Sequence, residues 1–172
     1  MIVKQPVAPV SNSPMPTTQQ SACYPVYIQD SSYHIYDTPG IDPENIGVDN
    51  VTQLSHDLQG VSLLVFCMRG RITEGMVKIY EAFSNPGRIP AVIVITGLEN
   101  EDDMESWWER NQYDIGRSGM QFDGHACVTG SKGKKLSNRY ASDDDYKQSQ
   151  KVVRDLIANL AVMFAYFISL LS

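Results

Sequence analysis

The sequence predicts an α/β domain in which helices alternate with the strands of a mostly parallel sheet. Two continuous apolar runs rich in β-branched residues, 61–67 (VSLLVFC) and 91–95 (AVIVI), are typical of strands buried on both faces. Between them, residues 73–83 repeat apolar positions at helical spacing. Buried strands that alternate with helices are typical of layered α/β folds, so we expect ligands beyond the carboxyl ends of the strands.

The amino-terminal part predicts a leader followed by a hairpin. Residues 1–22 are expected to be disordered, because residues 6–20 are rich in proline and follow neither the strand nor the helix period. Short β-rich runs at 23–29 and 33–36 flank the residues Asp-Ser-Ser at 30–32, which favour turns. This spacing predicts two antiparallel strands.

The carboxyl-terminal part predicts one more helix, one more strand and a long last helix. The helix begins within residues 102–110, the strand ends within 124–129, and the last helix covers 143–171. Three aspartates open the last helix, which suits the positive end of its macrodipole. Residues 156–171 are apolar on nearly all sides, but the run is shorter than the roughly 20 residues that span a bilayer. We interpret it as a buried helix, with a membrane anchor as the alternative.

Composition narrows the classes of partner. A chain of 172 residues suits one domain. Its net charge of −6 argues against nucleic acid as a partner, since binding to phosphate backbones needs a basic face. Its three cysteines match neither a zinc signature nor a secreted disulfide framework. We therefore predict a cytoplasmic protein, with membrane association through the carboxyl-terminal helix as the alternative.

Three loop motifs follow predicted strands. They read YDTPGI (36–41), VIVITGLE (92–99) and ACVTGSKG (126–133). In this order they resemble the DxxG motif, the guanine-reading NKxD or TKxD motif, and the SAK-like loop of P-loop GTPases. The run LLVFCMRGRIT (63–73) resembles G-domain proteins of fungi near the septins and the immune-associated GTPases.

The resemblance implies a guanine nucleotide, GTP or GDP, bound together with Mg²⁺. Asp37 at a strand end would hold the magnesium through a water, as hard cations prefer. Gly40 has no Cβ, so its backbone N–H could approach the γ-phosphate. Thr96 and Glu99 match the polar positions of the base loop, and Glu99 would accept hydrogen bonds from guanine N1–H and the N2 amino group. Gly97 stands where the family has a lysine.

The last motif implies a second wall for the base. Backbone N–H groups of Thr129, Gly130 and Ser131 would approach guanine O6. These residues complete the expected nucleotide site.

The sequence departs from the family in one important respect, the absence of the phosphate loop. The phosphate loop, GxxxxGK(S/T), occurs nowhere in the 172 residues, and the first strand and first helix are absent with it. The predicted fold is therefore a three-layer, P-loop NTPase-like sheet that is N-terminally incomplete, within residues 23–172. Because the family's first strand is central, the strands at 33–37 and 61–67 would be left with a gap between them or would pair directly.

Two interpretations follow from this departure. The chain is either a truncated G domain or a degenerate GTPase-like protein that acts as a binding or dimerisation module, with a homodimer possible. In both cases we expect weak GTP binding at most and little hydrolysis. The physical reason is that the phosphate loop supplies most of the affinity and the catalytic electrostatics.

Overall fold

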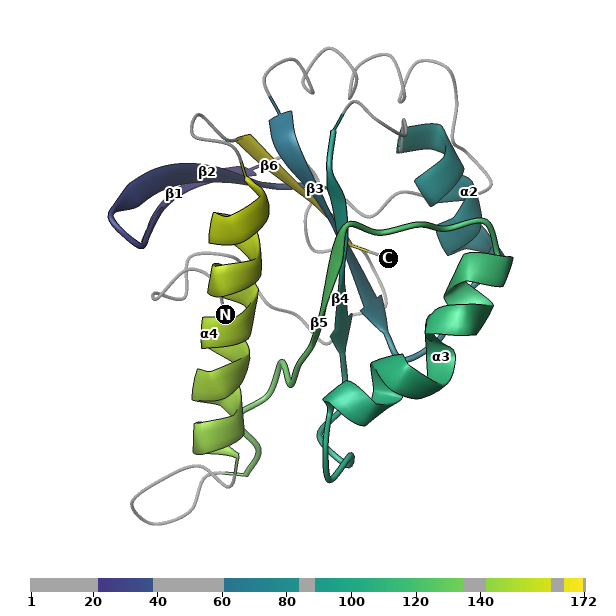
Figure 1. Cartoon of the computed structure of the whole chain (residues 1–172). Helices are drawn as coiled ribbons and strands as arrows, with labels where there is room; N and C mark the ends of the chain where they lie inside the picture. Colours follow the sequence, from purple (N-terminus) through teal and green to yellow (C-terminus); the bar gives the residue numbers. More distant parts are fainter. Residues whose placement is uncertain (1–21, 39–60, 84–88, 135–141, 162–165, 172) are drawn as a thin grey trace.

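The protein is a three-layer α/β/α sandwich around one twisted sheet (Figure 1). The computed structural model describes residues 22–38, 61–83, 89–134, 142–161 and, for the backbone alone, 166–171. Within these residues the sheet has six strands in the order β1-β2-β6-β3-β4-β5. Helices α2 and α3 cover one face and α4 covers the other.

The predicted hairpin is confirmed. Strands β1 (Ala22–Ile28) and β2 (Ser31–Asp37) pair antiparallel, with Ile28 opposite Ser31. The turn is one residue earlier than the sequence suggested, because Gln29 and Asp30 both have positive φ angles (46° and 65°), as a type I′ turn requires. Strand β1 lies at the edge of the sheet, where it can contain a proline.

The two apolar runs form central parallel strands, as predicted. Strand β3 (Val61–Arg69) pairs with β4 (Ala91–Thr96), which pairs with β5 (Gly124–Cys127). Alternate side chains of β3 enter two different cores: Leu64 lies in the core under α2 and α3, and Leu63 lies in the core under α4. Burial on both faces is therefore confirmed.

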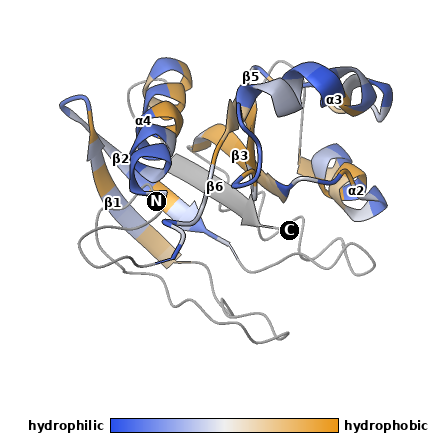
Figure 2. Ribbon diagram, turned by 90° about the horizontal axis from the view of Figure 1, so that it is seen from below, coloured by the Kyte–Doolittle hydropathy of each residue, from blue (hydrophilic) through white to orange (hydrophobic). Residues whose placement is uncertain are grey.

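Each of the three described helices packs one side against the sheet. Helix α2 (Glu74–Phe83) and helix α3 (Glu105–Arg117) contribute apolar side chains to the first core, and α4 (Asp143–Leu160) contributes Val153 and Ile157 to the second. Figure 2 shows the result: β3 is hydrophobic, while α2 and α4 carry both hydrophobic and hydrophilic sides. Among the described residues, no helix is both long and apolar enough to cross a membrane.

The prediction of a helix over 143–171 is wrong in its second half. Helix α4 ends at Leu160, and strand β6 (Tyr166–Leu171) lies between β2 and β3, parallel to both. Without it, β2 and β3 would each carry a row of unpaired N–H and C=O groups in the middle of the sheet. Strand β6 pairs both rows, so the expected gap or direct pairing is wrong too. The central strand of this sheet is the last strand in the chain.

The order of the elements determines on which face each helix lies and at which edge of the sheet the parallel strands end. The chain moves from β3 through α2 to β4 and through α3 to β5, and α4 then returns it to the middle of the sheet. Right-handed crossovers in opposite directions place their helices on opposite faces, which explains why α4 lies alone against its face among the described helices. The carboxyl ends of the parallel strands meet at the lower edge of the sheet in Figure 1.

Candidate functional site

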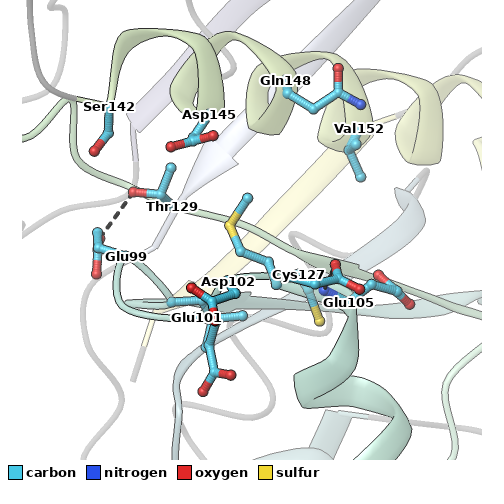
Figure 3. A pocket seen from close by; sticks show the side chains of 13 residues that line it. Glu99, Glu101, Asp102, Glu105, Cys127, Thr129, Ser142, Asp145, Gln148 and Val152 are labelled. Atoms are coloured by element: carbon cyan, nitrogen blue, oxygen red, sulfur yellow. Dashed lines mark hydrogen bonds between the residues drawn. The ribbon is translucent and has the colours of Figure 1, made fainter.

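A cavity of about 290 Å³ opens at this carboxyl edge. Its walls are the loop that follows β4, the end of β5 and the first half of α4 (Figure 3). Glu99 and Thr129, the polar residues of two predicted loop motifs, both line it. Crevices outside the carboxyl ends of parallel strands are where open α/β sheets bind ligands.

One hydrogen bond joins the two predicted base loops. The Thr129 hydroxyl lies 3.1 Å from a carboxylate oxygen of Glu99 and can donate to it (Figure 3). Glu99 is exposed, whereas Thr129 is buried at 1% exposure. Two motifs that lie 30 residues apart therefore meet at one point of the site.

The Thr129 segment is fixed by further hydrogen bonds. The backbone N–H of Thr129 donates to the buried hydroxyl of Ser149 on α4 at 3.0 Å. The Thr129 hydroxyl accepts the N–H of Ser131 at 3.1 Å and also lies 3.0 Å from the Ser131 carbonyl oxygen. The hydroxyl group can therefore rotate so that its O–H points to the Ser131 carbonyl instead of Glu99, and no buried donor is left unpaired. A ligand can thus take over the Glu99 oxygen at little cost.

The other predicted base residues lie in two different settings. The Thr96 hydroxyl donates to the Met68 carbonyl at 3.2 Å, so it ties β4 to β3 and does not line the cavity. Gly130 and Ser131 are exposed, and a Cβ on Gly130 would have no described atom within 4 Å. Packing among the described residues therefore does not require a glycine at 130.

Asp37 lies farther along the same edge. It is the last residue of β2, in register with Ser169 of β6, and three strand spacings separate β2 from β4, which is about 14 Å. The predicted phosphate glycine, Gly40, lies outside the described residues. Within the described part of the chain, no group of three or more His, Cys, Asp and Glu side chains could hold a metal ion.

The wall beside α3 is acidic. Glu101, Asp102, Asp103 and Glu105 line it, and Asp145 faces them from α4. Two of these carboxylates have described partners: Arg110 lies 2.7 Å from Glu101, and the His125 ring contacts Glu105. The negative charge disfavours phosphate and other anions on this side of the cavity.

Sequence reasoning missed an aromatic cluster under this wall. The His125 ring stacks on Trp108 with ring centroids 4.1 Å apart and an interplanar angle of 7°. The same imidazole contacts Glu105 at the cavity rim. No local pattern joins these residues, because the contact depends on how α3 packs against β5.

A buried thiol lies at the back of the cavity. Cys127 is 6% exposed, and burial raises the pKa of its thiol from 9.0 to about 12, with the negative charge of Glu105 adding to the rise. A thiol with such a pKa stays neutral and is a poor nucleophile at physiological pH. Cys127 therefore acts as an apolar lining group.

This shift makes a prediction for stability at high pH. The unfolded thiol ionises near pH 9 and the folded thiol near pH 12, so its contribution to the free energy of unfolding is complete below pH 9 and is lost between pH 9 and 12. The slope it adds is at most about 1.4 kcal/mol per pH unit. We expect Cys127→Ala to flatten the pH dependence of the urea midpoint in this window, although it lowers the midpoint itself. The exposed Cys23→Ala is the matched control, and an equally steep profile for both variants would contradict the assignment.

Comparison of the chain with protein families, with curated proteins and with solved structures gave no match.

Proposed function

We propose that this chain binds a guanine nucleotide weakly, with the base at Glu99 and Thr129 and with little or no hydrolysis. The observation that carries the proposal is the hydrogen bond between these two residues, which joins the two loops that resemble the base-binding loops of GTPases. The same loops border a cavity at the carboxyl edge of the sheet.

Recognition of guanine rests on the Glu99 carboxylate. Two carboxylate oxygens offer about four acceptor positions, and Thr129 uses one of them. Guanine presents two donors side by side, N1–H and the N2 amino group, which one carboxylate can accept together. Adenine has an acceptor at N1 and no amino group at C2, so its lone pair would face the negative charge. Next to N1, guanine carries the acceptor O6. The N–H groups of Thr129 and Ser131 already donate to the hydroxyls of Ser149 and Thr129, so the N–H of the exposed Gly130 is the one expected to approach O6.

The phosphates are expected to extend toward Asp37. The acidic wall beside α3 repels them, and the distance of about 14 Å from β4 to β2 is one that a nucleoside diphosphate can bridge. Magnesium would neutralise phosphate charge and bring water ligands to the Asp37 carboxylate. Since the 172 residues contain no GxxxxGK(S/T) loop, the phosphate contacts are few and the affinity is expected to be weak.

A second candidate is a dimerisation module of GTPase descent that needs no nucleotide. One observation favours it: β6 completes the middle of the sheet, so the described sheet has no unfilled central position that a phosphate loop and its strand would occupy. Sedimentation separates the two candidates. A dimer that persists without nucleotide and in the double variant Asp37→Ala, Glu99→Ala supports the module, whereas a monomer counts against it.

The direct test is a thermal shift with nucleotides. For a Kd near 1 mM, about 10 mM Mg·GDP would add about 1.4 kcal/mol and raise Tm by about 3–6 °C. We expect GDP and GTP to produce this shift and ADP to produce almost none. No shift with any guanine nucleotide would refute binding, and an equal shift with ADP would refute the role of Glu99.

A further inference from the structure

An arginine lies across the loop that carries Glu99. Arg69 is the last residue of β3, in register with Thr96 at the end of β4. Its side chain passes so close to Gly97 that a Cβ on Gly97 would lie 2.8 Å from Arg69 Cγ and 3.0 Å from Nε. Real Cβ atoms essentially never make a contact of 2.8 Å, so glycine is what allows the arginine to lie there.

The backbone of the loop requires glycine for a second reason. Gly97 has φ of +80°, a conformation that residues with a Cβ rarely adopt. The turn at Gly97 therefore sets the path from Thr96 to Glu99 and at the same time leaves the space for Arg69.

Arg69 forms no ion pair within the described part of the protein. The ion pairs found there involve Arg110, His125, Lys78 and Lys147 but not Arg69, whose side chain is exposed. By contrast, Arg110 is held by Glu101 at the acidic wall. Arg69 is thus an exposed cation at the end of β3 that lies against Gly97, two residues before Glu99.

We propose that the Arg69 guanidinium stacks on the face of the bound purine, whose edge is read by Glu99. This rests on the proposed nucleotide function and adds a residue that binds any purine, independently of Glu99. The guanidinium plane stacks on aromatic rings, and the contact at Gly97 holds the stem of the side chain beside the base loop. The positive charge also offsets part of the negative charge of Glu99, which allows an electron-rich base to approach.

The test compares nucleotide affinity in Arg69 variants of the full chain by titration calorimetry with Mg·GDP and with guanosine. We expect Arg69→Met, which keeps the aliphatic stem but removes the planar cation, to weaken both ligands about 5- to 30-fold. Arg69→Lys should recover part of the loss. Gly97→Ala should weaken both to a similar degree with Arg69 intact, because the new Cβ displaces its side chain.

The controls separate this inference from the proposed function. Arg117→Met removes the same charge at the far end of α3 and should leave both affinities unchanged. If the wild-type chain binds GDP and Arg69→Met binds both ligands equally well, the stacking role is refuted while the nucleotide function stands. If only GDP is weakened and guanosine is not, Arg69 contacts phosphate and the stacking role is refuted. If the wild-type chain binds no purine, both proposals fall, and if it binds ADP equally well but loses it in Arg69→Met, only the Glu99 role falls.

Discussion

Replacing Glu99 with alanine is expected to remove the preference for guanine. The two hydrogen bonds from guanine to the carboxylate are charge-assisted, and such bonds contribute about 1.5–3 kcal/mol each. We expect the affinity for Mg·GDP to fall at least about tenfold while the weak binding of Mg·ADP stays the same. Calorimetric titration of both nucleotides measures this ratio directly.

Two further variants make the Glu99 test specific. Glu99→Gln replaces one acceptor oxygen with an amide donor, and xanthine carries a carbonyl oxygen where guanine has its amino group, so this variant should bind XDP better than GDP. Glu101→Gln is the matched control, because Glu101 lines the same cavity but is held by Arg110. If Glu101→Gln loses guanine preference as fully as Glu99→Ala does, the charge of the cavity decides the preference and the assignment of Glu99 is wrong.

Placing proline in β6 is expected to destabilise the protein strongly. Ile168 is opposite Tyr36 of β2 and Leu64 of β3, in the middle of the sheet. Proline has no N–H to donate and is confined to sheet edges, so Ile168→Pro breaks the ladder where both sides are paired. We expect the free energy of unfolding to fall by at least about 1–3 kcal/mol, the cost of leaving a central carbonyl without its donor, out of the roughly 5–15 kcal/mol that holds a typical domain folded. Urea unfolding followed by circular dichroism measures the loss.

The control is a proline at the edge of the same sheet. Cys23 lies in β1 two residues before Pro25, so its N–H has the same orientation as the position where the strand already accepts proline. Cys23→Pro should change the urea midpoint little. In the wild-type chain, short backbone proton contacts from Ile168 to Tyr36 and Leu64 are expected in NMR spectra. Their absence, or a stable Ile168→Pro variant, would contradict the central position of β6.

Much of the fold could be predicted because its elements carry local signals. The runs at 61–67 and 91–95 are apolar throughout, which only a strand covered on both faces needs. The hairpin was located by its β-rich runs and turn residues, and its turn was misplaced by one residue since Gln29 has no strong turn preference.

The secondary structure of the carboxyl-terminal segment could not be predicted from local sequence patterns. Residues 156–171 are apolar on all sides, and such a run suits a buried helix and a buried strand equally well. The choice depends on the unpaired backbone of β2 and β3, which lie far earlier in the chain. Helix propensity is a weak preference, and two complete ladders of hydrogen bonds outweigh it.

By itself, the sequence determined the layered α/β class, the buried strands, the hairpin and the loops that hold Glu99 and Thr129. Only the tertiary structure decided that β6 takes the central place, that Thr96 faces Met68 while Glu99 meets Thr129, and that Arg69 lies across Gly97. The physical reason is the distance along the chain over which each kind of interaction acts. Strand and turn preferences act between neighbouring residues, whereas these contacts join strands and loops that meet only after the sheet has assembled and every central backbone group has found its partner.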